Sequence, residues 1–419
     1  MSESAAPAAH HRRLTQAEVD VICAKHDRLW SARMGGARAV FTWKDLSGLD
    51  LSGRNLCDAD FTGAILADCD LSGARLDNAN LFGADLQNCR LVDASLRRAD
   101  LRGACLRGAD LSGADLFEAD LREGAIAAAD RERGLKIIEH QSRAGNATGA
   151  ILAGANLERS RLSGVIAVKA DFTDAILKDA KLVRANLKQA SLSGANLAGA
   201  DLSGADLSGA DLRDAVLVGA KTFAWNVSEA NMSGALTDKP AGHDVLDLPF
   251  EKMIHDHARW CETGGQEGSP SVFDGADLRN LKTLSGFKLT AFSAKGATFY
   301  GLDMQGVQLQ GAHLEGADLR NCNLRRADLR GARLIGAKLS GSDLRDAQMG
   351  PLLIGPERNM PCDLTRALLK NTDLARADLR QTIFVDADLS RANFTGALLK
   401  GVDITGAQRE GARGLEGTL

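Results

Sequence analysis

In Ala200-Asp-Leu-Ser-Gly-Ala-Asp-Leu-Ser-Gly-Ala-Asp-Leu-Arg-Asp214, leucine returns every fifth residue, at Leu202, Leu207 and Leu212. On an α-helix a step of five residues turns the side chain by about 500°, so these leucines would not share one face. On a flat strand an odd step places successive leucines on opposite faces. The spacing therefore predicts a solenoid, in which the backbone bends once per five residues and the units bury their apolar side by stacking.

The other positions of this five-residue unit suit such a bend. Gly204 and Gly209 follow a leucine by two residues and tolerate the positive φ of a type II turn. Ala205 and Ala210 precede the next leucine by two residues and leave room beside it. We expect the remaining Asp, Ser and Arg side chains to face water.

The pattern Ala-(Asp/Asn)-Leu-x-x resembles that of the pentapeptide-repeat family and covers roughly three quarters of the chain in tandem. The resemblance implies an all-β solenoid of a particular kind, a right-handed quadrilateral β-helix. Four five-residue sides would form one coil, and coils would stack at a spacing of about 4.8 Å. The four sides come from the family, because the pentad itself requires only a repeated bend.

The central residues of the pentads are expected to form the structural core. We assign to it Leu46, Leu51, Leu56, Phe61, Leu71, Leu202, Leu207, Leu212, Leu319, Leu324, Leu329 and Leu389. Ala167 replaces leucine at one central position, so the sequence predicts a local weak point there.

Breaks in the repeat predict two solenoid lobes, each preceded by a short capping helix. The expected segments are a tail and capping helix in 1–44, a first solenoid in 45–236 with an insert at 127–148, a linker and second capping helix in 237–272, a second solenoid in 273–405 with an insert at 350–362, and a polar tail in 406–419.

Two segments have helical character. Leu14–Trp30 has apolar residues at helical spacing, and Thr15 with Glu18 forms a capping-box pattern. Phe250–Cys261 is also expected to be helical. Each segment contains a histidine and a tryptophan and precedes a glycine pair and new pentads, which indicates an internal duplication. A helix over a solenoid end would cover unpaired strand edges and open core.

The two inserts are expected to project from the array. The first contains the charged amphipathic run Asp130–His140, which suits a short helix or an ordered loop, and the pentads resume one residue out of register after it. The second contains three prolines, which cannot donate ladder hydrogen bonds, and it predicts an outward loop.

Composition favours a cytoplasmic protein without a membrane span. The 51 basic and 55 acidic residues nearly balance, so no overall field points to nucleic acid or to an anionic membrane. Met1–His11 lacks the apolar run of a signal peptide or anchor. The eight cysteines show no disulfide spacing, and Cys69, Cys89 and Cys322 stand at the alanine position of the pentad as small core residues, which indicates a reducing compartment. A bridge between Cys69 and Cys89 stays open.

No motif predicts catalysis, a cofactor or a metal. The best metal candidates are His243, His255, His257 and Cys261, and on a helix His257 and Cys261 lie one turn apart. A structural zinc ion needs four ligands, and the spacing here is irregular. The glycines recur by five as corner residues, and no P-loop pattern is present. We therefore expect no enzyme activity.

The resemblance raises one specific function, because some family members imitate duplex DNA towards type II topoisomerases such as DNA gyrase and confer quinolone resistance. Residues twenty apart would share a wall, so Asp60, Asn80, Asp100 and Asp120 would form an acidic row. Basic ladders would lie beside such rows, at Arg97, Arg102, Arg107, Arg122, Arg320, Arg325, Arg330 and Arg345. Neighbouring rows of opposite charge should largely cancel each other's electrostatic field at the distance of a partner, within a Debye length of about 8 to 10 Å.

The sequence therefore favours a non-enzymatic protein-interaction scaffold, with a DNA-mimicking topoisomerase modulator as the alternative. A basic nucleic-acid binder would need an arginine row without a facing aspartate row, and none is evident. The expected partner is a protein of unknown identity, and a homodimer stays open. Loops on a rigid frame are frequent binding sites, which directs attention to the two inserts.

Overall fold

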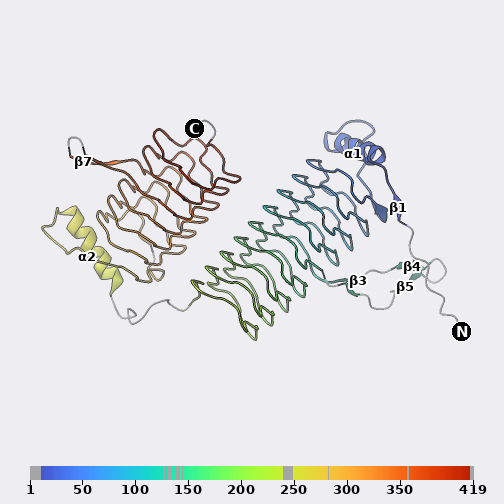
Figure 1. Ribbon diagram of the computed structural model, residues 1–419, viewed down its shortest axis with the longest axis horizontal. Helices are drawn as coiled ribbons and strands as arrows, with labels where there is room; N and C mark the ends of the chain where they lie inside the picture. Colours follow the sequence, from blue (N-terminus) through green and yellow to red (C-terminus); the bar gives the residue numbers. More distant parts are fainter. Residues whose placement is uncertain are drawn as a thin grey trace. The chain divides into compact units, whose positions relative to one another are not determined.

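The chain forms two compact units, Met1–Lys239 and Pro240–Leu419, each with its own hydrophobic cluster. The computed structural model describes residues 11–125, 128–130, 134–136, 142–143, 145–238, 249–281, 283–355 and 358–415. Figure 1 shows stacked coils in both units, with one helix beside the first coils of each.

Each pentad pairs with the pentad four repeats further along the chain. Asp60 forms a parallel bridge with Asn80, and Asn80 forms one with Asp100, so that bridged residues are 20 apart. Backbone hydrogen bonds accompany this pairing, since the N–H of Leu207 donates to the carbonyl oxygen of Asn226 at 2.7 Å. Four pentads therefore complete one coil.

The regular arrays contain single bridged residues in place of extended strands, and the described part of the chain contains no closed sheet. A two-residue turn follows each central residue, so too few residues per pentad stay extended to form a longer strand. At the second turn position the backbone is left-handed, with φ of 66° at Gly204 and 57° at Asp58. Glycine adopts this conformation most easily, and Asp and Asn tolerate it better than other residues.

The central side chains fill the inside of each unit. None of the twelve residues assigned to the structural core from the sequence is more than 1% exposed; they are Leu46, Leu51, Leu56, Phe61, Leu71, Leu202, Leu207, Leu212, Leu319, Leu324, Leu329 and Leu389. Ala167 is also fully buried, and its N–H donates to the carbonyl oxygen of Asn186 at 2.8 Å. The coil is therefore continuous where leucine is missing.

Both predicted helices are present. Helix α1 spans Gln16–Trp30 and has Thr15 at its N-cap in a full capping box with Glu18. Helix α2 spans Phe250–Glu262, with Pro249 at its N-cap and no side-chain cap. The buried faces of both helices belong to the same clusters as the first pentads of their units.

Short strands occur mainly outside the regular pentads. Strand β1 (Arg12–Arg13) pairs in parallel with β2 (Lys44–Asp45) and ties the N-terminal segment to the first coil. Neither helix in the described part of the chain is long and apolar enough to cross a bilayer.

The first insert and the residues just before it contain short antiparallel pairs, and the predicted end at 148 is too late because Asn146 already pairs within the coil. Strand β3 (Gly124–Ala125) pairs with β6 (Ser142–Arg143), and β4 (Ala128–Asp130) pairs with β5 (Gly134–Lys136). The helical alternative for this insert is thus wrong where the chain is described, because the returning backbone pairs with itself; its other residues lie outside the described ranges.

The second insert is an antiparallel hairpin of β7 (Leu352–Gly355) and β8 (Arg358–Met360). The sequence predicted an outward loop here, and the structure shows that the two sides of this segment pair with each other. Coil pairing resumes at Asp363 and continues as far as Arg413, so the predicted start of the polar tail at 406 is too early: Gln408 and Arg413 still pair with the preceding coil.

Bridges across the inserts explain the register of the repeat. Cys105 pairs with Asn146, so the first insert adds four pentad lengths and one further position to the coil, and the pentads move by that one position. Arg333 pairs with Asp363, so the second insert adds two whole pentad lengths and keeps the register. The irregular leucines near Leu281 reflect one extra position in their coil, because Asp277 pairs with Thr298.

Candidate functional site

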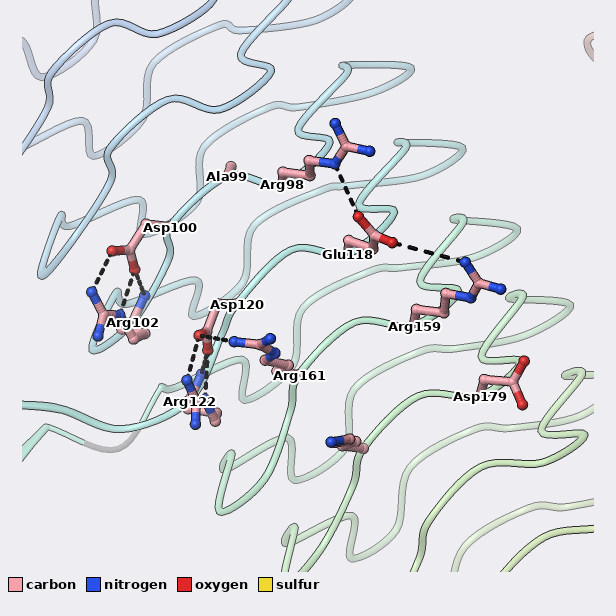
Figure 2. Close-up of a pocket in the computed structure, with 11 residues that line it drawn as sticks. Arg98, Ala99, Asp100, Arg102, Glu118, Asp120, Arg122, Arg159, Arg161 and Asp179 are labelled. Carbon is pink, nitrogen blue, oxygen red and sulfur yellow. Dashed lines mark hydrogen bonds and ion pairs between the residues drawn. The ribbon is translucent and has the colours of Figure 1, made fainter.

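A groove of about 730 Å³ opens on four consecutive coils of unit 1, in the part that Figure 2 enlarges. It follows the bridged column that contains Asp60, Asn80, Asp100, Asp120, Arg161, Lys181, Asp201 and Lys221, which we call the Asp60 column. The groove is lined by the column residues from Asp100 to Lys181 and by the corner residues two positions before them, Arg98, Glu118, Arg159 and Asp179.

The acidic half of the groove is neutralised by arginines of the same pentads. Arg102 donates to both carboxylate oxygens of Asp100, through Nε at 2.9 Å and Nη2 at 2.6 Å. Arg122 holds Asp120 in the same way, at 2.9 and 2.7 Å. Asp and Arg flank one buried leucine and point to the same side, so a two-toothed contact forms without backbone adjustment.

These contacts shift the pKa values of the paired groups. Burial raises the pKa of Asp120, but the hydrogen bonds from Arg122 outweigh burial and lower it overall. The same hydrogen bonds raise the pKa of Arg122. Both groups therefore stay charged and paired near neutral pH.

The same Asp–Leu–Arg arrangement recurs in both units. The pairs are Asp100 with Arg102, Asp120 with Arg122, Asp211 with Arg213, Asp277 with Arg279, Asp318 with Arg320, Asp328 with Arg330, Asp343 with Arg345, and Asp378 with Arg380. The acidic row expected from Asp60 to Asp120 does lie in one column, but two of its carboxylates are cancelled within their own pentads.

The basic half of the groove lacks such partners. Beyond the first insert the Asp60 column continues with Arg161 and Lys181, whose pentads carry Ser163 and Val183 where Arg122 stands in the earlier one. The nearest carboxylate to Arg161 is Asp120, with Nη1 and Oδ2 3.7 Å apart. Within the described ranges Lys181 makes no ion pair.

The corner residues of the groove are likewise unevenly paired, with one arginine close to a carboxylate and another farther from it. Figure 2 shows Glu118 between Arg98 and Arg159: Arg98 Nε donates at 2.9 Å, whereas Arg159 Nη1 is 3.9 Å away. A Cβ placed on Gly199 would lie 2.3 Å from Oδ1 of Asp179, so that carboxylate covers the following coil. The positive charge of the groove is therefore concentrated at Arg159, Arg161 and Lys181.

Among the described residues the candidate metal ligands do not form a metal site, although His257 and Cys261 meet at one carbonyl oxygen. His257 uses both ring nitrogens, since Nδ1 accepts from the N–H of Ser271 at 3.1 Å and Nε2 donates to the carbonyl oxygen of Thr290 at 3.2 Å. Cys261 Sγ contacts the same oxygen at 3.6 Å, and His255 packs on Phe287. His243 lies outside the described residues. The described ranges contain no group of three potential metal ligands.

The cysteine bridge left open by the sequence is absent, because Cys69 and Cys89 are both free. Cys69 Sγ donates to the carbonyl oxygen of Leu46 at 3.0 Å, and Cys89 Sγ donates to that of Cys69 at 3.2 Å. Burial raises the pKa of Cys69 to about 11. These thiols are therefore small core side chains that stay protonated near neutral pH.

A second exposed feature is the β7–β8 hairpin of unit 2. A Cβ at Gly331 would lie 2.7 Å from Leu352 and 2.9 Å from Met360, so the base of the hairpin rests on corners without side chains. Leu353 and Ile354 on the same hairpin are 68% and 50% exposed.

The rows of charged residues 20 apart could be predicted from the sequence, but the groove could not. The signal is present in the chain, because rows of four pentads, with the first insert set aside, place Arg161 directly after Asp120. How much of the first insert leaves the coil was not known from the sequence, so this change of sign stayed hidden.

A model of pentapeptide repeats, in 8 copies, matches residues 45–81, 79–116, 146–179, 180–219, 308–346 and 362–411. The chain belongs to the pentapeptide-repeat family. The matched residues cover more than half of its length and include Asp100, Arg161 and Lys181 of the groove. Among curated proteins none matches this chain.

Several solved pentapeptide-repeat structures resemble this chain. HetL from the cyanobacterium Nostoc sp. strain PCC 7120, involved in heterocyst differentiation regulation, is 24% identical over 91% of this chain and 93% of its own, with a TM-score of 0.19. Rfr23 from the cyanobacterium Cyanothece 51142 is 30% identical over 33% of this chain and 88% of its own, with a TM-score of 0.21. QnrB1, a plasmid-mediated fluoroquinolone resistance protein, is 18% identical over 46% of this chain and 94% of its own, with a TM-score of 0.29. Because these TM-scores are low, the family assignment depends on the repeat match.

Proposed function

We propose that this chain is a non-enzymatic protein-interaction scaffold. In this proposal each unit is a right-handed quadrilateral β-helix whose first coil is capped by α1 or α2. The pairing of residues 20 apart and the burial of helix residues Val19 and Ile254 against the first pentads support it. A stack of such coils is a rigid support that presents side chains in straight rows.

The observation that carries the proposal is the charge pattern of the walls. Eight Asp–Leu–Arg pentads neutralise their own carboxylates, so these parts of the walls have little net field at the distance of a partner. Against that background the groove near Arg161 is a distinct feature. Local charge on a neutral, rigid wall gives specificity towards one partner surface.

Chemistry inside the chain supports a non-catalytic role. Burial raises the pKa of Cys322 to about 12, which makes its thiol a poor nucleophile. His257 is held by two hydrogen bonds and takes part in packing. We place the protein in the cytoplasm, since eight free cysteines are compatible with a reducing compartment.

The test is capture of a partner by the intact purified chain, with a matched chain that lacks residues 127–144 and so keeps Asn146, which pairs with Cys105. The scaffold predicts at least one protein that co-purifies in a fixed ratio with the intact chain and binds it again after separate purification. If reconstitution fails with every co-purified protein, the scaffold proposal is wrong. Loss of binding in the shortened chain would locate the contact beside the first insert.

The alternative is a DNA-mimicking modulator of a type II topoisomerase. It is favoured by the column of Asp60, Asn80, Asp100 and Asp120, which places four acidic or amide side chains in one line. It is opposed by the arginines that pair with Asp100 and Asp120. The decisive assay is DNA supercoiling by purified gyrase with and without this protein: unchanged supercoiling at micromolar concentration removes the alternative, and inhibition or protection from a quinolone establishes it.

A further inference from the structure

The groove of unit 1 has an excess of positive charge that the protein itself does not neutralise. Its lining contains six basic and four acidic side chains. Arg98, Arg102 and Arg122 are each taken up by a carboxylate within 2.9 Å. The excess of two positive charges therefore lies on the other three basic residues, with Asp179 as the one remaining acid.

Those three residues are accessible and weakly held. The side chains of Arg159 and Arg161 are 57% and 56% exposed, and their closest carboxylates are 3.9 and 3.7 Å away, beyond hydrogen-bond distance. Lys181 is exposed and makes no ion pair with any residue of the described ranges. Guanidinium groups in this state can turn towards an incoming carboxylate and bind both of its oxygens.

From this arrangement we infer that the groove binds an extended acidic segment of a partner protein, with its carboxylates on Arg159, Arg161 and Lys181. This inference rests on the proposed scaffold function and names the chemistry of the partner. The groove crosses four coils, which is about 14 Å at the spacing of paired backbone, and an extended peptide of about four or five residues covers that length.

The fixed acids of the groove distinguish this ligand from a nucleic acid. Asp100, Glu118 and Asp120 line the same groove as Arg161, and Asp179 lies two residues before Lys181. A nucleic acid carries a negative charge at every phosphate and would meet these carboxylates along its path. An acidic peptide can place uncharged residues beside them and its carboxylates at the basic end, so the mixed lining selects a segment with local charge.

The ligand also explains why the charge changes within one column. If the column continued with the Asp–Leu–Arg pentad of Asp120 and Arg122, each new charge would be paired locally. At Arg161 and Lys181 the pentads instead provide cations without acids. The first insert lies between these two kinds of pentad, and strand β3, just before the insert, starts two residues after Arg122.

The experiment is a binding titration of the full-length protein with a fluorescent acidic peptide of about six residues that alternates Glu and Ser. A lysine–serine peptide and a short DNA duplex are the comparison ligands. We expect saturable binding of the acidic peptide that weakens as salt is raised, and no binding of the lysine peptide. Tighter binding of the duplex than of the peptide would overturn the inference.

Substitutions then locate the site. Arg161→Gln and Lys181→Gln should each weaken peptide binding about threefold to tenfold, and Arg161→Glu should abolish it. The matched control is Lys221→Gln, which lies in the Asp60 column outside the groove and should leave the affinity unchanged. All three side chains are exposed, and equal thermal unfolding midpoints would show that the fold is retained.

The outcomes separate this inference from the scaffold proposal. Equal peptide affinity in Arg161→Gln and Lys221→Gln overturns the groove assignment, even if a protein partner is captured by the intact chain. If the partner binds Arg161→Glu as tightly as the wild type, the scaffold stands and the acidic-segment inference fails. Peptide binding that is lost only in the groove variants, together with failure of every partner reconstitution, would contradict the scaffold proposal while keeping the groove.

Discussion

Both helices bury an apolar face against the first pentads of their unit, but α1 adds a side-chain hydrogen bond and an ion pair, whereas α2 adds contacts between aromatic rings. The Gln16 amide donates to the carbonyl oxygen of Asp50 at 2.8 Å, and Arg54 pairs with Asp20 at 2.6 Å. In unit 2, by contrast, Phe250 packs against Phe273 with ring centres 6.1 Å apart. The two helices thus occupy equivalent places through different chemistry.

One histidine in each helix makes the comparison sharper. His26 Nδ1 accepts from the N–H of Ala39 at 3.1 Å, while its buried Nε2 has no partner among the described residues. His257 Nδ1 accepts from the N–H of Ser271 at 3.1 Å, and its Nε2 also finds Thr290. Both helices therefore carry a histidine that accepts a backbone hydrogen bond, but among the described residues only the histidine of unit 2 has a partner for both ring nitrogens.

The largest expected effect tests whether the two units are separate in stability. Leu207→Lys in unit 1 and Leu324→Lys in unit 2 each bury a charge in a closed core and should cost about 3 to 5 kcal/mol of unfolding free energy. Each should shift only one of two urea-unfolding transitions. The control Ser208→Lys changes a half-buried wall position and should cost less than about 1 kcal/mol. A single transition shifted equally by both lysine variants would break the comparison.

The next effect distinguishes the two histidines. His257→Ala removes a ring that contacts Phe292, leaves the N–H of Ser271 unpaired and leaves the oxygen of Thr290 with only the long contact from Cys261, so it should cost unit 2 about 3 kcal/mol. His26→Ala also removes a buried ring but only one hydrogen bond, so it should cost unit 1 about 1 kcal/mol less than His257→Ala costs unit 2. Denaturant titration of both variants measures the difference. Equal losses would show that the bond to Thr290 has no net effect.

A pH effect should appear in unit 2. Burial lowers the pKa of His257 below its usual value of 6.5, partly offset by the hydrogen bond to Thr290. The folded state therefore binds fewer protons than the unfolded state. The contribution of His257 to the unfolding free energy of unit 2 is complete above about pH 6.5 and is lost as pH falls. The slope should reach at most about 1.4 kcal/mol per pH unit. Unfolding titrations between about pH 7 and pH 5 should show this slope in the wild type.

The matched variant for the pH effect is His257→Gln, which keeps a polar side chain but does not titrate. It should lose the slope in unit 2 over the same pH range. A wild-type and a variant protein with the same pH dependence would show that other groups are responsible.

The smallest effect compares the helix starts. Thr15→Ala removes the capping box of α1 and should cost about 1 kcal/mol. Pro249→Ala removes no side-chain cap from α2 and should cost less than about 0.5 kcal/mol. Thermal unfolding of unit 1 and unit 2 in the two variants checks this order, and a larger loss at Pro249 would reverse it.

Much of the fold could be predicted because the repeat carries its own register. The interval between Leu202, Leu207 and Leu212 is sufficient to identify the core positions, and Thr15 with Glu18 identifies the start of α1. The same rules apply at every pentad, so a short stretch predicts the long array. The duplicated order of histidine, tryptophan and glycine pair also placed the second helix correctly.

The rest depended on contacts between residues far apart in the chain. The groove forms only because Asp120 and Arg161, which stand on opposite sides of the first insert in the sequence, are neighbours in one column. The hairpin at Leu352 likewise depends on the empty corner at Gly331, which the local sequence does not connect to it. The first insert was open to a helical reading because its residues are amphipathic, and backbone pairing decided against it where it is described.

The central claim is that residues 20 apart lie directly above one another. The N–H of Gly53 donates to the carbonyl oxygen of Ser72 at 2.8 Å, so cysteines at Ser52 and Ser72 should lie about 4.8 Å apart at Cα, within the range of a disulfide. Oxidation of Ser52→Cys/Ser72→Cys followed by peptide mass spectrometry should give a disulfide in nearly all molecules, and Ser52→Cys/Thr62→Cys should give none. A bridge in the second pair, or none in the first, would contradict a coil of four pentads.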